Sequence, residues 1–537
     1  MAREIMADYC IAGCGIAGAI LAVKLAATGK KIVILEQGPR FSEEDRENLI
    51  ANARKTLNDF ADYNDDVIPG TVTPHTSANQ EGKVAEWPAQ RLFGVGGTAL
   101  HFEGFMIRPR EEDLKVRTLH GYGRDWPISY RELEPWLLRA EQETGVSGSD
   151  DNPYASPRSG SYPMPAHAFS YFDREIFLPA LSKLAITGHS CPRAVNSKPY
   201  RGRSACMACR ACKFCPSGAR YSPDRVHVRM LDAQDNVMIL EHASLRRLET
   251  DPAGRRIVAA HTMQIEEKTP VTVTAERFIL ALGGVETPRM LMLSAGSGPH
   301  GKGLGNMGGQ LGRNFGDHTN PFLTYDVGRP VGSRLGFETA ISDHFRARKD
   351  RREKPGFTIF ASPAVDWVPV GSDTTRWMTT ADFLSLGKLR EAIPRMASLY
   401  IMTEMKGEGT LELDTNTLDA FGSPVAKITM PLTDWDREAH RELVKLAPEI
   451  GNAMGASRMS EVSPPEFGLG YHPSGATAMA KTPDEGVCDP DLKVFGIENL
   501  YLASNSVFPQ MGANPPTLTI AALALRLAAH LEGRAAS

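Results

Sequence analysis

The chain has few cysteines, no long apolar run and no excess of either charge. It contains 60 lysines and arginines against 64 aspartates and glutamates, which gives a net charge of −4. This balance does not indicate a nucleic-acid partner, which a strongly basic composition would favour. No apolar run reaches the ~18–20 residues of a membrane helix, and the longest candidate, 518–531, is interrupted by Arg526. We therefore expect a globular protein without a membrane span of its own.

The N-terminal residues do not have the pattern of a secretory signal peptide. The first seven residues are partly charged, and the apolar residues after them fit a strand. We therefore expect a cytoplasmic protein, which would reach the periplasm only if a partner subunit carried it there. Structural disulfides are disfavoured in the cytoplasm. The length of 537 residues predicts two or more domains.

A glycine-rich turn near the N-terminus gives the strongest indication of a cofactor. A short apolar strand is predicted at 8–12, a helix follows it, and a second strand at 31–36 ends in Glu36. The turn after the first strand has the spacing Gly-x-Gly-x-x-Gly, formed by Gly13, Gly15 and Gly18. Such glycines allow a tight turn, close approach of a pyrophosphate and close packing of helix on strand, while Glu36 can accept hydrogen bonds from ribose hydroxyls. A dinucleotide site is favoured over a βαβ unit without a ligand.

A second glycine-rich stretch, 91–104, contains Gly94, Gly96 and Gly97 and favours FAD over NAD. With this stretch the sequence resembles the glucose-methanol-choline (GMC) oxidoreductases, which are FAD enzymes. The resemblance continues through blocks that span nearly the whole chain: 275–291, 311–318, 471–479 and 497–528. It implies a two-domain α/β flavoprotein, in which a substrate domain with a mixed β-sheet lies over the isoalloxazine of a Rossmann-like FAD domain.

The expected domains follow the discontinuous order of that family. Residues 1–320 would form the FAD-binding domain, with the cysteine-rich loop 191–222 inserted in it. Residues 321–465 would form the substrate-binding domain, and residues 466–537 would return to the FAD domain and the active site.

The substrate domain has no motif of its own. The stretch 397–414 alternates like sheet strands, and the charge-rich stretch 333–395 is interpreted as a lid or a partner surface. Three residues are candidates for sugar contacts, with packing as the alternative for each: Trp367, Trp377 and Glu404.

The C-terminal segments supply the expected catalytic residues. The stretch 499–504 predicts a strand, and 517–531 predicts a helix whose N-terminus would face the flavin N1–C2=O edge, where negative charge collects on reduction. The residues that match the catalytic positions of the family are His472 and Asn514. His472 would take the hydroxyl proton while hydride passes to flavin N5, and Asn514 would donate an amide N–H to the substrate oxygen. Turn formation is the alternative role for both residues.

Two further residues belong to the expected flavin site. Pro515 stands beside Asn514, just before the last predicted helix. His101 follows Gly97 by four residues, at a position where some family members carry a covalent histidyl link to the flavin C8-methyl. The sequence leaves open whether His101 forms such a link or packs beside the flavin.

Half of the eight cysteines fall within ten residues, directly before Pro216: Cys206, Cys209, Cys212 and Cys215. Thiolates at Cys-x-x-Cys spacing followed by Cys-Pro suit iron–sulfur clusters. The surrounding segment, 192–228, is most similar to the large, catalytic subunit of bacterial FAD-dependent sugar dehydrogenases, in which a cysteine-rich loop binds a cluster that removes electrons from the flavin. Four local cysteines could hold [4Fe-4S], and three of them could hold [3Fe-4S].

Two departures from known patterns leave alternatives open. Only two residues, Lys213 and Phe214, precede the last Cys-Pro, where ferredoxins have three. The similar dehydrogenases have a longer, Asn-rich loop. A Cys₄ zinc site, disulfides and free thiols therefore remain alternatives to a cluster.

These patterns predict an FAD-dependent enzyme that oxidises a hydroxyl of a sugar, a glycoside or a sugar-like alcohol. A cluster implies that electrons leave singly to a protein, and so implies a small subunit or a cytochrome as electron acceptor. The basic residues around the cysteines would either attract an acidic partner or only be solvated. Two alternatives remain: a GMC-type oxidase that uses O₂, and a flavoprotein with structural zinc in the cysteine loop.

Overall fold

The computed structural model describes most of the chain. The described residues are 3–45, 47–48, 76–78, 84–86, 91–209, 212, 215–296, 300–332, 337–363, 393–465 and 472–533. Trp367 and Trp377, two of the candidates for sugar contacts, lie outside these residues. Among the helices of the described part, none combines the length and the apolar character needed to cross a bilayer.

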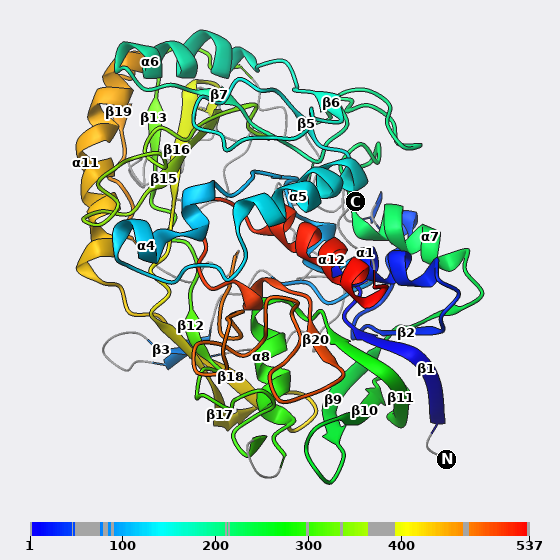
Figure 1. The fold of residues 1–537 in the computed structure, drawn as a ribbon. Helices are drawn as coiled ribbons and strands as arrows, with labels where there is room; N and C mark the ends of the chain where they lie inside the picture. The colour runs from blue at the N-terminus through cyan, green and yellow to red at the C-terminus, as the bar shows by residue number, and fades with distance from the viewer. Residues whose placement is uncertain are drawn as a thin grey trace.

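The largest sheet has seven strands and includes both the first strand, β1, and the last strand, β20 (Figure 1). Its order is β8 (Val237–Leu240), β2 (Ile32–Leu35), β1 (Arg3–Ala12), β11 (Thr269–Leu280), β10 (Ile257–Gln264) and β9 (Ala243–Thr250), with β20 (Leu500–Leu502) also paired with β11. The strands β8, β2, β1, β11 and β20 run parallel, whereas β10 is antiparallel to β9 and β11. The sheet is therefore mixed, and its parallel part with α1 (Ile16–Ala26) is the Rossmann-like unit that the glycine spacing predicts.

A second sheet of six strands lies at the other end of the molecule (Figure 1). Its order is β19 (Arg458–Met459), β13 (Phe322–Asp326), β16 (Met396–Thr403), β15 (Phe357–Pro363), β14 (Ala340–Ser342) and β7 (His189–Ser190). Every neighbouring pair in this sheet is antiparallel. One strand, β7, comes from the predicted FAD domain, and the domain boundaries stay a prediction.

The remaining strands form two smaller sheets. The five-stranded sheet has the order β12 (Arg313–Phe315), β17 (Gly409–Leu418), β18 (Pro424–Thr429), β3 (Thr76–Ala78) and β4 (Val84–Glu86). The two-stranded sheet pairs β5 (Ser147–Gly148) with β6 (Met164–Pro165).

Helices cover the two large sheets. Beside the seven-stranded sheet, α12 (Thr517–Leu531) packs against α1 and α5 (Tyr130–Thr144), and α8 (Gly283–Leu293) follows β11. On the six-stranded sheet, α11 (Asp434–Met454) packs against α6 (Leu178–Lys183). The other helices and helical turns are α4 (Val116–His120), α7 (Arg229–Asp232), η1 (Gly97–Leu100), η2 (Glu111–Leu114), η3 (Asp173–Phe177), η4 (Asp224–Val228), η7 (Ile393–Arg395) and η8 (Asn505–Val507).

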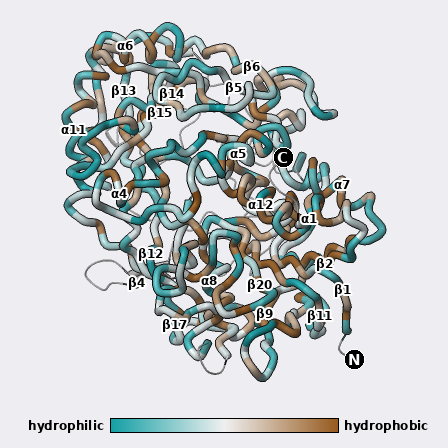
Figure 2. The backbone as a smooth tube through the Cα atoms, viewed as in Figure 1, coloured by the Kyte–Doolittle hydropathy of each residue, from teal (hydrophilic) through white to brown (hydrophobic). Residues whose placement is uncertain are grey.

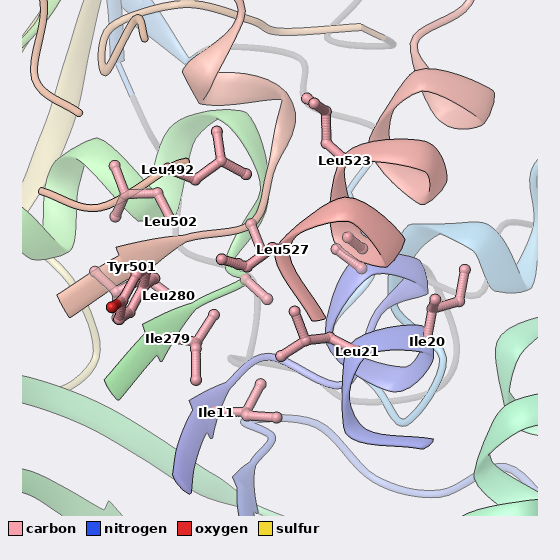
Figure 3. Packing of buried hydrophobic residues seen from close by; sticks show 14 of the residues in the cluster. Ile11, Ile20, Leu21, Ile279, Leu280, Leu492, Tyr501, Leu502, Leu523 and Leu527 are labelled. Atoms are coloured by element: carbon pink, nitrogen blue, oxygen red, sulfur yellow. The ribbon is translucent and has the colours of Figure 1, made fainter. Parts of the chain in front are cut away.

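Burial explains this arrangement of helices. The helices α1 and α12 are hydrophobic along most of their length, and Figure 2 shows the same colour in the neighbouring strands. Side chains from β1, α1, β11, β20 and α12 meet in one buried cluster, including Ile11, Leu21, Ile279, Leu502 and Leu527 (Figure 3). In contrast, α11 buries one stripe of residues on the sheet and presents a polar face outward.

Candidate active site

The first glycine turn lies between the end of β1 and the start of α1. Gly13 has φ +97°, and a Cβ there would lie 2.4 Å from the carbonyl oxygen of Ala281. A Cβ on Gly18 would lie 2.0 Å from the carbonyl oxygen of Gly13. Both positions therefore exclude any side chain, and the turn keeps β1, α1 and the segment after β11 in close contact.

The second glycine stretch lies directly on this turn. The backbone N–H of Gly96 donates to the carbonyl of Cys14 at 2.9 Å. A Cβ on Gly97, which has φ +58°, would lie 2.9 Å from the Cα of Gly15. The structure thus brings Gly96 and Gly97 of the second stretch into contact with the turn formed by Gly13, Gly15 and Gly18.

Glu36 completes this group at the end of β2. Its carboxylate is buried and accepts hydrogen bonds from the backbone N–H groups of Cys14 at 2.9 Å and Gly38 at 3.0 Å. Burial raises the pKa of Glu36 to about 7, although these donors oppose the effect. A carboxylate can accept further hydrogen bonds, and no side chain that the structure describes caps the N-terminus of α1. These features fit a dinucleotide, with ribose hydroxyls at Glu36 and phosphates at α1.

His101 follows this site along the chain. It comes directly after η1, which begins at Gly97, and its side chain is buried. Its place beside the glycine stretch agrees with a position near a flavin, and the covalent link stays a prediction.

The predicted base, His472, lies beside a second histidine. The backbone N–H of His472 donates to Asp317 Oδ1 at 3.0 Å, and the same oxygen accepts the backbone N–H of His318 at 2.8 Å. The two imidazole rings meet edge to face, with their centroids 5.1 Å apart and their planes at 82°. Asp317 therefore fixes both histidine backbones in one place.

The surroundings of both rings favour the neutral imidazole. Burial lowers the pKa of His472 well below its ordinary value, and the neighbouring His318 lowers it further. Burial also lowers the pKa of His318 to about 4, although backbone groups of Thr403 and Asn514 oppose the effect. A neutral imidazole is the form that can accept a proton.

Asn514 lies in the loop before α12 and is buried. Its Oδ1 accepts a hydrogen bond from Arg346 Nη2 at 2.9 Å, while its Nδ2 donates to the carbonyls of Ile107 at 3.4 Å and Pro515 at 3.2 Å. Because the backbone of Asn514 also contacts the His318 ring, the predicted pair His472 and Asn514 lies on either side of His318. Their catalytic roles stay predictions.

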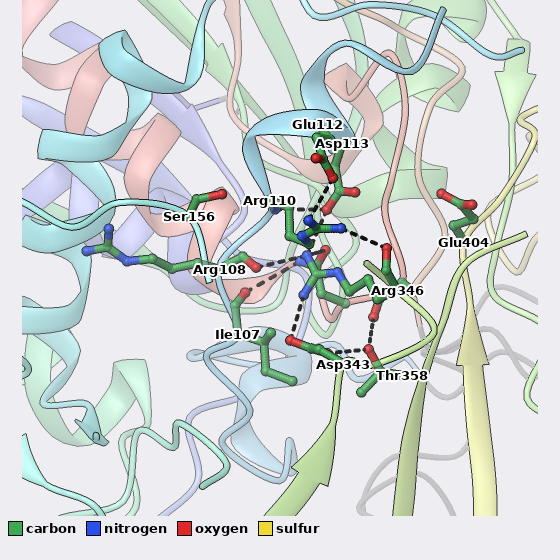
Figure 4. A network of polar contacts seen from close by, with 12 residues as sticks. Ile107, Arg108, Arg110, Glu112, Asp113, Ser156, Asp343, Arg346, Thr358 and Glu404 are labelled. Carbon is green, nitrogen blue, oxygen red and sulfur yellow. Dashed lines mark hydrogen bonds and ion pairs between the residues drawn. The ribbon is translucent and has the colours of Figure 1, made fainter. Parts of the chain in front are cut away.

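Arg346 belongs to a buried network of charged groups (Figure 4). Arg346 Nη2 lies 2.7 Å from Asp113 Oδ2, and Arg351 Nη2 lies 3.0 Å from Asp113 Oδ1. Arg351 also pairs with Glu404, which accepts the hydroxyl of Tyr122 at 2.7 Å. Glu404, a candidate for a sugar contact, is therefore engaged in this ion network.

The four clustered cysteines differ in exposure. Cys215 is buried, Cys206 and Cys212 are half-buried, and Cys209 is exposed; none of the four is in a disulfide. Backbone N–H groups donate to sulfur from Ala208 to Cys206 at 3.4 Å and from Arg220 to Cys215 at 3.1 Å. Within the described residues, which omit 210, 211, 213 and 214, no three such side chains form a group that could hold a metal ion. The thiols are not arranged as a ligand set, and the iron–sulfur assignment stays a prediction.

Arg220 connects the cysteine loop to the second glycine stretch. Its Nε donates to the carbonyl of Cys212 at 2.7 Å, and its Nη2 and Nη1 donate to the carbonyls of Leu100 at 2.6 Å and Ala99 at 3.0 Å. The guanidinium is buried. The cysteine loop therefore lies next to η1, which belongs to the predicted flavin site.

Comparison with known proteins settles the family. The models described as GMC oxidoreductase match residues 7–320 and 406–524, which together make up most of the chain. The chain belongs to the GMC oxidoreductase family. This confirms the predicted α/β flavoprotein fold, and GMC membership makes the chain an FAD-dependent oxidoreductase of CH–OH donors.

Individual proteins resemble this GMC oxidoreductase over its whole length. The fructose dehydrogenase large subunit of Gluconobacter japonicus is 29% identical over 98% of both chains. The gluconate 2-dehydrogenase flavoprotein of Pantoea cypripedii is 24% identical over 96% of this chain and 92% of its own. Among solved structures, formate oxidase superposes with a TM-score of 0.69 at 17% identity over 99% of both chains. At that identity the structural match shows the fold alone.

Three site residues of this GMC oxidoreductase were not identified from the sequence. Asp317 and His318 end the block 311–318, whose match was noted without a role for either residue. Arg346 lies in the stretch 333–395, which was interpreted as a lid or partner surface. That interpretation is wrong for Arg346 and Arg351, because both side chains are only 1% exposed and both pair with Asp113. Charge alone does not distinguish a solvated arginine from a buried, paired one.

Proposed function

We propose that this GMC oxidoreductase is a dehydrogenase that oxidises a hydroxyl of a sugar, a glycoside or a sugar-like alcohol. The observation that carries the proposal is the neutral histidine pair, His472 and His318, beside Asn514. The full-length similarity to a fructose dehydrogenase subunit and a gluconate dehydrogenase flavoprotein supports a sugar or a sugar acid as the substrate class.

His472 and Asn514 each have one task in this reaction. FAD, bound at the two glycine stretches and Glu36, supplies the hydride acceptor N5. Neutral His472 takes the proton of the substrate hydroxyl, and burial keeps it ready to do so at neutral pH. Asn514 Nδ2 donates to the substrate oxygen, where negative charge develops as the proton leaves.

We also propose that the cysteine loop binds an iron–sulfur cluster, [4Fe-4S] or [3Fe-4S], which would transfer electrons to a small subunit or a cytochrome. Two N–H···S contacts support this role, because such bonds tune clusters. The contact of Arg220 with η1 supports a position of the loop beside the proposed flavin site. The described thiols would have to come closer to one another to bind a cluster. We propose a cytoplasmic location, or a periplasmic one when a partner subunit carries the chain there.

A substrate panel tests the reaction. The purified flavoprotein is mixed without O₂ with D-fructose, D-gluconate, D-glucose or 2-methyl-1,2-propanediol, and flavin absorbance is followed. We expect at least one sugar or sugar acid to bleach the flavin, and steady turnover to need a dye or protein acceptor. Rapid turnover with O₂ alone would instead identify an oxidase, and bleaching by no polyol would contradict the proposal.

A substitution tests the base. His472→Ala should retain FAD but slow flavin reduction by ~10²–10⁴-fold, the usual contribution of a positioned acid–base group. The control is His530→Ala at the exposed end of α12, which should reduce its flavin at the wild-type rate. Equal rates for His472→Ala and wild type would remove His472 from the mechanism.

Metal analysis tests the cysteine loop. Anaerobically purified protein should contain iron and acid-labile sulfide, and the double variant Cys212→Ser/Cys215→Ser should lose both while it keeps FAD. Substrate should still bleach the flavin of the variant, whereas turnover with a cytochrome should fail. Stoichiometric zinc without iron would assign the loop to structural zinc.

A further inference from the structure

Arg346 reaches the active-site loop from a distant part of the chain. It follows β14 in the segment that leads to β15, and its guanidinium is 1% exposed. Its Nη2 donates to Asn514 Oδ1 at 2.9 Å, to Asp113 Oδ2 at 2.7 Å and to the carbonyl of Arg108 at 2.9 Å (Figure 4). One nitrogen thus joins the predicted substrate-binding amide to a carboxylate and to the backbone.

The contact determines which end of the Asn514 amide faces Arg346. A guanidinium has donors and no acceptor, so the atom beside it must be the amide oxygen. The Nδ2 end makes only the longer contacts of 3.2 and 3.4 Å, to Pro515 and Ile107. The N–H groups are therefore the part of the amide that can turn to a substrate oxygen. A charged donor at Oδ1 also polarises the amide and strengthens its N–H groups as donors.

Two carboxylates hold Arg346 in this position. Asp113 lies on one side, and Asp343 Oδ2 lies 3.5 Å from Nη1 on the other. Arg346 and Arg351 lower the pKa of Asp113 to about 2 although burial acts in the opposite direction, so Asp113 stays ionised. The hydroxyl of Thr358 donates towards Asp343 at 2.8 Å and the carbonyl of Ala513 at 2.9 Å. The network therefore contacts the Asn514 loop at two neighbouring residues.

We propose that Arg346 is a positioning residue for hydroxyl oxidation, which orients and polarises the Asn514 amide so that its N–H groups stabilise the developing negative charge on the substrate oxygen. The inference rests on the proposed function, because it requires Asn514 to contact the substrate. It assigns the charge-rich segment after β14 to the chemistry of the active site.

A double-mutant cycle tests the proposal on the complete flavoprotein. The variants are Arg346→Lys, Asn514→Ala and their combination; lysine keeps the charge but cannot hold two partners with a planar fork. Flavin reduction by the fastest substrate of the panel should slow about 10- to 100-fold in Arg346→Lys, and ~10²–10³-fold in Asn514→Ala. The combined variant should be no slower than Asn514→Ala alone, because Arg346 acts through Asn514.

Arg351→Lys serves as the matched control. Arg351 is equally buried and pairs with the same Asp113, but its second ion-pair partner is Glu404, and it makes no such contact with Asn514 within the described residues. The factors by which Arg351→Lys and Asn514→Ala each slow flavin reduction should multiply in their combined variant. Thermal unfolding of all variants gives a second cycle that needs no substrate, in which Arg346 and Asn514 should be coupled and Arg351 and Asn514 should not.

The possible outcomes are distinguishable. Unchanged flavin reduction in Asn514→Ala would contradict the proposed role of Asn514 itself. If the effects of Arg346→Lys and Asn514→Ala on the rate of flavin reduction multiply, Arg346 is a structural residue and the positioning role is overturned. The same conclusion follows if the two residues are coupled only in thermal unfolding. If Arg346→Lys does not fold with FAD, the charge-compensated pair Arg346→Gln/Asp113→Asn replaces it in the same cycle.

Discussion

His472 and His318 are two buried imidazoles side by side, and their surroundings lower the pKa of both. Asp317 holds both backbones through one oxygen. The ring of His318 is fully enclosed, with Nδ1 2.5 Å from the carbonyl of Thr403. His472 as a whole residue is half-buried. His472 is therefore the histidine that can exchange a proton with substrate, while His318 raises the cost of a charge there.

This arrangement predicts the pH dependence of flavin reduction. A base works in its neutral form, and the pKa of His472 is lowered by burial and by His318. The rate should therefore stay high as the pH falls through 6.5, the ordinary value of histidine, and should decline only at lower pH. Stopped-flow reduction between pH 4.5 and 8 measures this. His318→Asn should move the decline to higher pH, and a wild-type decline centred at or above pH 6.5 would contradict the prediction.

At the residue scale, the family blocks identified the two catalytic candidates but not the neighbouring Asp317 and His318. His472 and Asn514 were named in this way, and the structure places both beside His318. Arg346 could not be found so, because its contact with Asn514 joins positions 168 residues apart. No spacing rule links residues whose proximity depends on the packing of β14 and β15 against the C-terminal loop.

Among the elements, the first glycine turn leaves no room for a side chain at Gly18. Gly18→Ala should lower both FAD content and thermal stability, because its Cβ would lie 2.0 Å from the carbonyl of Gly13 and would push α1 away from β1. Gly29→Ala is the control, since Gly29 lies just after α1 and has no atom within 4 Å of an added Cβ. Its φ of +77° limits the effect to a loss of about 1 kcal/mol in stability. Full FAD content in Gly18→Ala would contradict the prediction.

Local sequence patterns predicted where individual helices and strands lie better than they predicted which strands pair. The last helix, expected at 517–531, is α12 (Thr517–Leu531), and the strand expected at 499–504 contains β20. The stretch 397–414 forms strands as expected, but they belong to two sheets: β16 pairs with β13 and β15, and β17 pairs with β12 and β18. Alternation reports which face of a strand is buried and not which strand lies beside it.

For the whole molecule, the buried ion network predicts how acid affects stability. The pKa of Asp113 is lowered to about 2, below the ~3.9 of an unfolded aspartate. Its contribution to the free energy of unfolding is therefore complete above about pH 4 and is lost as the pH falls towards 2. Asp113→Asn should be less stable than wild type at pH 7 and should lose less further stability between pH 4 and pH 2.

Thermal unfolding across this pH range measures the effect. Asp235→Asn, which replaces an exposed aspartate away from the network, should follow the wild-type curve. Parallel curves for Asp113→Asn and wild type below pH 4 would contradict the assignment.

The pairing of β20 with β11 has a consequence for how the chain is made. Strand β11 ends at Leu280 and pairs with β1 from Val271 to Leu280, yet its end from Phe278 to Leu280 receives β20 only from residues 500–502. A nascent chain on the ribosome thus carries this strand edge open while more than two hundred further residues are added. An open edge is a template for pairing with other chains. The cofactor sheet is therefore completed only after the chain has been made as far as residues 500–502, although β1 comes from residues 3–12.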